Sequence, residues 1–174
     1  RLLADGADTG KELKLNEGNG WRGSFDGLPR YDHGREVAYA VTEAEVSGVD
    51  GSKYETSVEG NASDGFTITN VNTETVEVSG TKTWDDDNDR DGARPASITV
   101  NLMRDGARVL SRTVAPDASG AWAYSFAGLP RYADDGHEYA YTVTEEAVPN
   151  YATTIDGADI TNSHTPGRTS VTVT

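Results

Sequence analysis

Three polar side chains, those of Lys82, Glu145 and Asn162, occur where an alternating strand pattern otherwise places apolar residues. One face of the segment from 76 to 84 is apolar apart from the lysine, with the members Val76, Val78, Gly80, Lys82 and Trp84. Glu145 and Asn162 end two further alternating sets, 139–145 and 160–162. Burying an ammonium group without a partner costs several kcal/mol, so the pattern predicts that the three side chains meet inside the fold.

Two interpretations explain such a group of residues. In the first, Lys82 and Glu145 form a buried ion pair to which Asn162 is hydrogen-bonded, because buried charges are usually paired. In the second, burial lowers the pKa of the lysine and raises the pKa of the glutamic acid. A neutral lysine amine is a nucleophile, and the Asn162 carboxamide carbon is its electrophile.

Glu145 would then relay protons, and the product would be a Lys–Asn isopeptide bond with release of ammonia. A carboxamide is a poor electrophile, so this reaction requires close contact without water.

Short strands separated by turns must position these residues. Alternating apolar residues also mark the segments 98–102 and 122–126, and no window shows a sustained helical period. Turn signals separate the segments: Asp105-Gly106, Ser119-Gly120, Gly128-Leu129-Pro130, Asp135-Gly136 and Asp156-Gly157. About seven short strands at this spacing predict an all-β fold of the sandwich type.

The sequence contains two copies of one unit, whose matching segments keep their order along the chain. The matched pairs are Phe25–Tyr31 with Phe126–Tyr132, Glu36–Glu43 with Glu138–Glu145, and Ile68–Asn70 with Ile160–Asn162. Glu43 and Asn70 therefore stand in the first copy where Glu145 and Asn162 stand in the second.

The two copies differ in completeness. We expect a first repeat over residues 1–74 that lacks its first strand or strands, a complete repeat over 75–166, and the start of a following repeat over 167–174. The first copy begins at the equivalent of the strand end near Leu102, so it has no counterpart of Lys82. None of the other lysines aligns with Lys82: Lys11, Lys14 and Lys53. The chain is interpreted as a window on a longer tandem array.

Several ordered motifs resemble the collagen-adhesin B-type (Cna B-type) repeat, which occurs in wall-anchored adhesins and pilins of Gram-positive bacteria. The motifs are Val78–Asp86, Asp91–Pro95, Tyr141–Pro149 and Ile160–Pro166. The resemblance implies tandem prealbumin-like, reverse-immunoglobulin β-sandwiches. It also implies a self-made isopeptide bond between the lysine of the first strand and the asparagine of the last.

The resemblance also implies a role for each polar residue. Lys82 is the amine, Asn162 the acceptor and Glu145 the proton relay, whereas Glu43 and Asn70 match the relay and acceptor of the first repeat. Glu146 is adjacent to the relay, but its side chain points outward by strand parity.

Composition excludes several classes of partner. The chain of 174 residues has a net charge of -14, which repels nucleic acid and anionic membranes. Cysteine is absent, so no disulfide or thiolate chemistry is expected, and no cofactor is expected either. No apolar run of transmembrane length and no signal peptide occur in this stretch. The expected partners are neighbouring repeats of the same chain, with a host surface ligand as a further candidate.

Two other groups of residues invite a metal interpretation. Asp87, Asp89, Asp91 and Gly92 fit the first half of an EF-hand loop, but the twelfth position is Ile98 instead of a bidentate acid. We therefore interpret the run as a solvated acidic loop and expect no metal site. The three histidines have no second ligand at metal spacing and are expected at the surface: His33, His137 and His164.

These observations lead to a structural function. We expect stalk or spacer repeats of an extracellular, cell-wall anchored adhesin or pilin, since tandem sandwiches with short linkers form stiff arrays. The alternative is a direct adhesin module that binds a host matrix protein or glycan. An enzyme acting on an external substrate is not expected, because the only chemistry that the sequence suggests is a single-turnover reaction within the chain.

Overall fold

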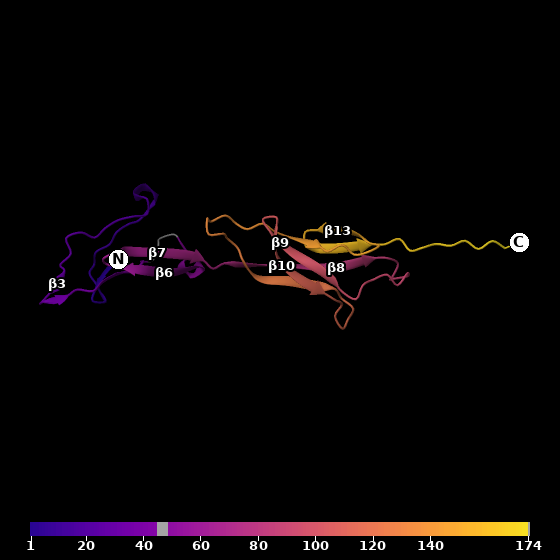
Figure 1. Cartoon of the computed structure of the whole chain (residues 1–174), viewed down its shortest axis with the longest axis horizontal. Coiled ribbons are helices and arrows are strands. Elements are labelled where there is room, and N and C mark those ends of the chain that lie inside the picture. Colours follow the sequence, from indigo (N-terminus) through magenta and orange to yellow (C-terminus); the bar gives the residue numbers. More distant parts are fainter. Residues whose placement is uncertain (45–48, 174) are drawn as a thin grey trace. The chain divides into compact units, whose positions relative to one another are not determined.

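The computed structural model describes residues 1–44 and 49–173 of the chain (Figure 1). The chain divides into two compact units, Arg1–Thr73 (unit 1) and Glu74–Thr174 (unit 2). Strands dominate both, and the helices among the described residues are two short 3-10 turns, η1 (Glu17–Asn19) and η2 (Gly51–Lys53). Neither turn has the length or the apolar character that a membrane-spanning helix needs. The predicted all-β class is confirmed.

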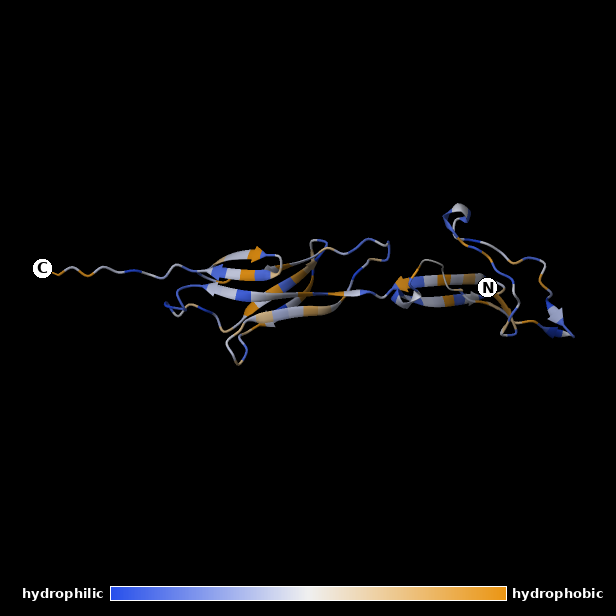
Figure 2. Cartoon of the chain, turned by 180° about the vertical axis from the view of Figure 1, so that it is seen from behind, coloured by the Kyte–Doolittle hydropathy of each residue, from blue (hydrophilic) through white to orange (hydrophobic). Residues whose placement is uncertain are grey.

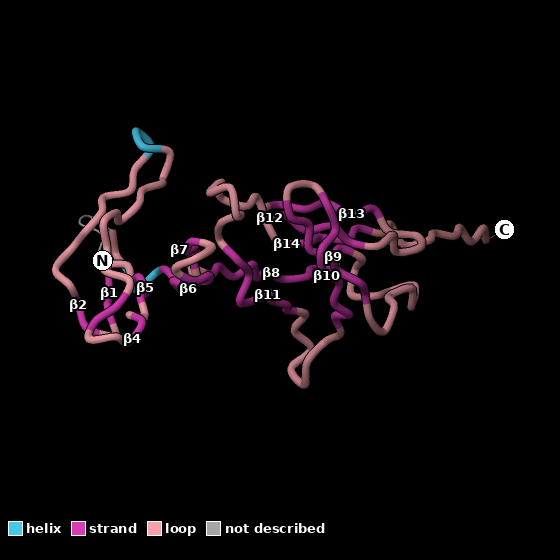
Figure 3. Tube along the Cα trace, turned by 60° about the vertical axis from the view of Figure 1, so that its left-hand side comes forward, coloured by secondary structure: helices cyan, strands magenta, loops and turns pink. Residues whose placement is uncertain are grey.

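The described part of unit 2 contains seven strands in two sheets (Figure 3). The four-stranded sheet has the order β11 (Ala123–Pro130), β8 (Thr75–Asp85), β14 (Asp159–Ser163) and β13 (Ala152–Asp156). The three-stranded sheet has the order β10 (Ala107–Val114), β9 (Ile98–Arg104) and β12 (Tyr141–Glu145). Strand β8 pairs antiparallel with β11 and parallel with β14, so it lies in the middle of its sheet.

The core of unit 2 lies between the two sheets. Ile98, Val100 and Leu102 on one face of β9 are buried, and Val100 and Leu102 are completely so. The other sheet contributes Tyr124, Phe126 and Ile160 to the same cluster. Figure 2 shows the alternation of hydrophilic and hydrophobic residues along the strands. The apolar faces predicted from the alternation are therefore the faces that are buried in the core. The sandwich prediction is confirmed.

The prediction of a turn at Gly128-Leu129-Pro130 is wrong. Strand β11 continues to Pro130, and its register against β8 shifts between Phe126 and Leu129. Gly128, with a φ of 68°, occupies the left-handed conformation that such a bulge requires. Leu129 then returns to the core at 5% exposure, and this burial favours continuing the strand over ending it.

Unit 1 contains smaller sheets. One sheet has the order β2 (Ala7–Asp8), β1 (Leu2–Ala4) and β5 (Tyr39–Val41), and two hairpins join β3 (Tyr31–Asp32) to β4 (Arg35–Glu36) and β6 (Tyr54–Asn61) to β7 (Gly65–Asn72). Within the described part of unit 1, Leu2 is the one hydrophobic side chain in the buried class, at 2% exposure. Unit 1 therefore combines short hairpins and the pairing of β1 with β5, without a sandwich core.

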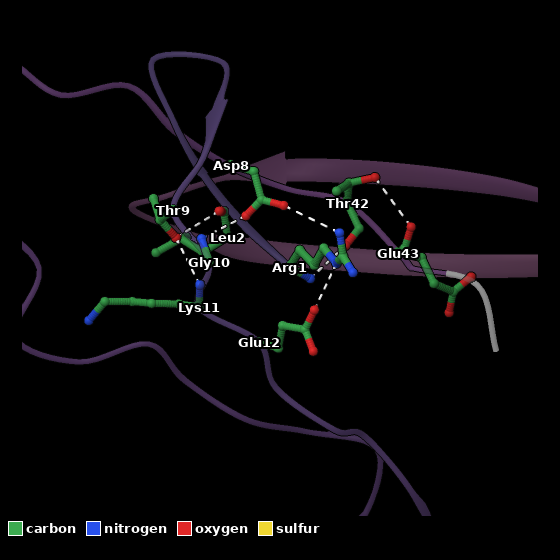
Figure 4. Close-up of polar contacts among 9 residues, drawn as sticks. All are labelled: Arg1, Leu2, Asp8, Thr9, Gly10, Lys11, Glu12, Thr42 and Glu43. Atoms are coloured by element: carbon green, nitrogen blue, oxygen red, sulfur yellow. Dashed lines mark hydrogen bonds and ion pairs between the residues drawn. The ribbon is translucent and has the colours of Figure 1, made fainter. Parts of the chain in front are cut away.

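Polar contacts around Arg1 join the first strand of unit 1 to the segments beside it (Figure 4). The Arg1 guanidinium lies 2.8 Å from Glu12 and 3.4 Å from Asp8, and its main-chain nitrogen donates to the Thr42 carbonyl at 2.8 Å. These ion pairs are exposed, so each contributes at most about 1 kcal/mol. These contacts help to orient the first strand, but they do not supply the stability that a hydrophobic core would give.

The segment after β14 forms no strand over residues 164–173. Val171 and Val173 alternate there as in a strand, and they are 85% and 89% exposed. Thr174, the last residue of the predicted following repeat, lies outside the described residues.

Candidate functional site

Three strands from both sheets position the predicted site of unit 2. In the parallel ladder of β8 and β14, Lys82 stands opposite Ile160 and Asn162 opposite Trp84. Side chains two positions apart share a face, so Lys82 and Asn162 are diagonal neighbours on the core side. Glu145 ends β12 in the facing sheet, with its Oε1 3.7 Å from the Lys82 Nζ, and both of these side chains are completely buried.

Hydrogen bonding at this site is incomplete. Both polar atoms of the Asn162 carboxamide and the Oε1 of Glu145 are buried without a hydrogen-bond partner. Lys82 donates to the Thr83 carbonyl at 3.1 Å, and its Nζ lies 4.1 Å from the centre of the Trp84 ring. The ion pair of the first interpretation is therefore present, but its hydrogen-bonded asparagine is not. An unpartnered buried carboxamide is costly, which makes this cluster a candidate for chemistry.

The electrostatics of the site raise the fraction of Lys82 amines that are neutral. Burial is the main cause that lowers the Lys82 pKa, from 10.5 to about 8, against the opposing attraction of Glu145. With this pKa about a tenth of the amines are neutral at pH 7, against roughly three in ten thousand for an ordinary lysine. The buried lysine is thus a much better nucleophile than a surface lysine.

Thr153 is a member of the site that sequence reasoning missed. Its hydroxyl donates to the Glu145 Oε2 at 2.8 Å, and the residue pairs with Asn162 across the β13–β14 ladder. One signal in the sequence could have identified it: the pattern Tyr-x-Thr occurs once in each copy, at Tyr54–Thr56 and Tyr151–Thr153.

The equivalent residues of unit 1 also come together. The Asn70 amide donates to the Glu43 Oε1 at 3.0 Å. The Thr56 hydroxyl lies 2.5 Å from the Asn70 Oδ1 and 3.4 Å from the Glu43 Oε2. Both Glu43 and Asn70 are exposed, whereas Asn162 is completely buried. The relay and acceptor residues thus lie close together in both units. Only in unit 2 is the acceptor asparagine buried and accompanied by a lysine from β8.

A polar and aromatic cluster lies beside Lys82. Asp86, with its side chain 1% exposed, accepts two hydrogen bonds of 2.6 Å from Arg94 and one of 2.9 Å from the Tyr151 hydroxyl. The Arg94 guanidinium holds the pKa of Asp86 well below its usual range. The Trp84 ring packs edge-on between Trp122 and Tyr151, with centroids 5.3 Å and 4.9 Å away. This cluster fixes the ring over which the Lys82 ammonium lies.

Gly80 allows β8 to approach the turn between β13 and β14. A Cβ at this position would lie 2.0 Å from the Ala158 carbonyl oxygen, which also accepts a hydrogen bond from the Tyr124 hydroxyl. The residue after Gly80 in β8 is Thr81. Its amide and its hydroxyl donate hydrogen bonds to Asp159, the first residue of β14, at 2.8 Å and 2.9 Å. These contacts fix the register that places Lys82 beside Asn162.

The carboxylates of the acidic run serve different partners. Asp87 pairs with Arg90 at 2.6 Å, and Asp89 accepts from the Arg94 amide at 3.0 Å. Asp91 accepts from the Gly167 amide at 2.8 Å and contacts the His164 ring at 3.1 Å. Residues 1–44 and 49–173 contain no group of three or more His, Cys, Asp or Glu residues that could hold a metal ion. Calcium independence remains a prediction.

The histidines divide into two classes. The side chains of His33 and His137 are 95% and 51% exposed, as expected for surface positions. His164 is only 17% exposed, so the predicted surface position is wrong for this residue. Its ring packs 5.3 Å from Tyr151 and bridges Asp91 and the Asn150 carbonyl, and these contacts exclude solvent.

Glu146 points outward, as its parity predicts. Its side chain is 56% exposed, accepts from the Asn101 amide at 2.8 Å and lies 3.4 Å from Arg108. Glu146 therefore offers a neighbouring carboxylate that is separate from the site.

Comparisons with known proteins agree with the repeats found in the sequence. The family model of the Cna protein B-type domain matches residues 1–71 and 78–163. A collagen adhesin of Staphylococcus aureus is 43% identical over an alignment of 175 positions, which covers 99% of this chain and 14% of that protein. The chain thus spans a small part of this relative's length.

Solved structures of that type of protein are similar as well. The crystal structure of two B repeat units of the collagen binding protein of Staphylococcus aureus has a TM-score of 0.66 and 39% identity, covering 95% of this chain and 43% of that one. The structure of a single B repeat unit is 34% identical with a TM-score of 0.48, covering 95% and 85%. Since the family model matches both units, the chain belongs to the Cna protein B-type domain family.

Proposed function

We propose that the chain is a stalk segment of an extracellular, cell-wall anchored surface adhesin or pilin, and that unit 2 is locked by a self-formed isopeptide bond between Lys82 and Asn162. The observation that carries the proposal is the buried, unpartnered Asn162 carboxamide on the same face as Lys82, whose Nζ is 3.7 Å from Glu145. The family and its surface-adhesin relative support the location.

The proposed bond suits a stalk because of the strands that it joins. Strand β8 is where the chain enters unit 2, and β14 is the last strand before it leaves. The two strands are parallel neighbours, so tension along the chain pulls on both. A covalent bond from Lys82 to Asn162 would carry this tension directly and relieve the intervening residues of the sandwich.

The reaction needs only groups of this chain. Lys82 passes a proton to Glu145 and its neutral amine attacks the Asn162 side-chain carbon. Glu145 returns this proton to the leaving nitrogen, which departs as ammonia. Glu145 then accepts the second proton, which the attacking nitrogen loses as the new amide forms, and passes it to the departing ammonia. Atoms balance, since one amine and one carboxamide give one secondary amide and one ammonia. Burial supplies the water-free contact that a poor electrophile requires.

The reaction is a single turnover and does not make the chain an enzyme. Both reacting groups are consumed in the product, and Glu145 alone is regenerated. In unit 1, Glu43 and Asn70 stand at the relay and acceptor positions, but no lysine aligns with Lys82, so we propose no cross-link there. Adjacent repeats of the same chain are the proposed partners.

A tryptic digest tests the reaction and its relay. The parent chain should give one joined peptide containing Lys82 and Asn162, whereas Glu145→Ala should give the two separate peptides, because no group then accepts the lysine proton. Glu146→Ala is the matched control, since this neighbour is exposed and should leave the joined peptide intact. Joined peptides in the Glu145→Ala chain would refute the relay.

Direct binding of a host protein is the second candidate, raised by the collagen adhesin among the relatives. A solid-phase assay of the chain on immobilised collagen tests it. Saturable binding would make these repeats an adhesive surface, and the stalk proposal predicts no binding above that of an unrelated acidic protein.

A further inference from the structure

The contact between Thr153 and Glu145 has a counterpart in each unit. Thr153 lies 2.8 Å from the Glu145 Oε2 in unit 2, and Thr56 lies 3.4 Å from the Glu43 Oε2 in unit 1. Both threonines are also the cross-strand partners of the acceptor asparagines, Asn162 and Asn70. A threonine–glutamate contact therefore occurs in both units, although the Thr56 hydroxyl also lies 2.5 Å from the Asn70 Oδ1. The contact does not require the lysine-bearing strand.

The two carboxylate oxygens of Glu145 have different environments, because the Thr153 hydroxyl binds only one of them. Oε2 accepts the threonine hydrogen bond, whereas Oε1 lies 3.7 Å from the Lys82 Nζ and has no hydrogen-bond partner. A carboxyl group rotates about a soft terminal torsion, so one fixed oxygen fixes the direction of the other. Without the hydroxyl, Glu145 would lose the only hydrogen bond that orients it among the described residues.

We propose that Thr153 is a positioning residue for isopeptide formation. Its hydroxyl holds Oε2, so that Oε1 faces Lys82 and receives its proton. Because the hydroxyl hydrogen already occupies Oε2, the transferred proton resides on Oε1, from which it passes to the nitrogen that leaves as ammonia. Thr153 neither gains nor loses a proton, and atoms and charge balance without it. This inference rests on the proposed cross-link between Lys82 and Asn162.

The test measures the rate of cross-linking in the full chain. Cell-free synthesis is stopped at intervals, and the fraction of the joined Lys82–Asn162 peptide is measured after trypsin digestion. Thr153→Val keeps the shape but removes the hydroxyl, and it should slow cross-linking at least about tenfold. Thr153→Ser keeps the hydroxyl and should restore a rate within about threefold of the parent.

Thr154→Val is the matched control. Thr154 is the next residue of β13, and its side chain projects from the opposite face, where it makes only a 3.5 Å contact with the Thr161 carbonyl. This variant should cross-link at the parent rate. On a Lys82→Ala background, in which no bond forms, Thr153→Val and Thr153→Ser should melt together if the hydroxyl acts on the reaction and not on the fold.

Three outcomes would overturn the inference. Parent-like cross-linking of Thr153→Val would show that the hydroxyl does not position Glu145. Equal slowing of Thr153→Ser and Thr153→Val would assign the effect to packing. A parent chain that never cross-links would refute the proposed bond itself, and this result is distinct from the first two because they require a reactive parent.

Discussion

Unit 1 and unit 2 carry the same motifs but differ in what surrounds them. In unit 2, β8 pairs with β11 on one side and β14 on the other. In unit 1, the described residues contain no counterpart of β8. The segment 22–29, which aligns with β11, forms no strand there, and β7 pairs with β6 alone. The hairpins are therefore local products of their own sequences, whereas the sandwich depends on one central strand.

Equivalent aromatic residues show the same difference. Trp122 is half-buried against Trp84 with 5.3 Å between the ring centroids, whereas Trp21 is 67% exposed. Phe126 is 4% exposed in the core of unit 2, and its counterpart Phe25 is only half-buried. Because the residue types are identical, the burial must come from β8 and the core that it completes.

The candidate site follows the same rule. The hairpin of β6 and β7 brings Thr56 and Asn70 together, and Glu43 reaches them, without a β8 counterpart. What β8 adds in unit 2 is the amine and the exclusion of water. The comparison predicts that every perturbation of β8 acts on unit 2 and leaves unit 1 as it is.

The largest expected difference is in amide hydrogen exchange. Amides of β9, in the core of unit 2, should exchange orders of magnitude more slowly than those of β6, whose eight residues are all exposed. Mass spectrometry of peptic fragments measures both strands in one sample. Equal protection of β6 and β9 would break the comparison, because it would mean that unit 1 is stable without a core.

Loss of the lysine should have the next largest effect. The proposed bond encloses about 80 residues, and by analogy with a disulfide it contributes roughly 4–5 kcal/mol to the stability of unit 2. Lys82→Ala should therefore lower the melting temperature of unit 2 by at least about 15 °C in calorimetry. Lys14→Ala, an exposed lysine of unit 1, is the control. Unchanged melting of the Lys82→Ala chain would count against a stabilising bond.

Gly80→Ala should have a smaller effect that is confined to unit 2. The added Cβ would lie 2.0 Å from the Ala158 carbonyl, so β8 must shift at a cost of roughly 1–3 kcal/mol. Gly51→Ala in unit 1 is the matched substitution, since no atom lies within 4 Å of its added Cβ, and it should be tolerated. Denaturant unfolding compares the two variants. Equal stabilities would show that β8 does not need the close approach.

A pH dependence should appear only where Lys82 stays an amine. In the Asn162→Ala chain Lys82 keeps its amine, and burial in this fold lowers the pKa of that amine from 10.5 to about 8. The folded pKa is the lower one, so the unfolded state binds more protons between these values and stability rises with pH across this window. Below pH 8 Lys82 is protonated in both states, so the full free-energy cost of burying its charge lowers the stability of the folded chain.

Urea midpoints at pH about 7.5 and about 9.5 measure this dependence. In a parent chain cross-linked as proposed, the nitrogen would be an amide and would not titrate, so the midpoint of the variant should rise relative to that of the parent. Parallel midpoints in the two chains would argue against a buried titrating amine.

Removal of divalent ions should have the smallest effect. Asp87, Asp89 and Asp91 already pair with different partners of the chain, so a chelator should leave the melting temperature of unit 2 unchanged. A clear drop in the presence of chelator would show that these carboxylates hold an ion.

Much of this arrangement could be predicted from the sequence, because alternation determines which face of a strand is buried. The faces of Lys82, Glu145 and Asn162 followed from alternation alone, and the pairing of Glu43 with Asn70 agrees with the repeat. The bulge at Gly128 could not be predicted in this way, since a glycine with a proline two residues later is also the signal of a turn. The structure decides for the bulge because Leu129 is buried.

Other features required knowledge of which strands are neighbours. Thr153 is an exposed strand residue, and its contact with Glu145 becomes apparent only when β13 is placed beside β14 and opposite the end of β12. The burial of His164 likewise depends on Asp91 and Tyr151, which are distant in sequence. Contacts between segments that are remote in sequence produce no local sequence pattern, so they could not be predicted from the sequence.

The intact mass of the purified chain tests the central claim most directly. The account predicts a mass lower than that of the sequence by one ammonia, with the deficit located in the joined peptide of Lys82 and Asn162 and none in unit 1. A mass equal to that of the unmodified sequence would contradict the cross-link, and a deficit of two ammonias would contradict the difference between the two units.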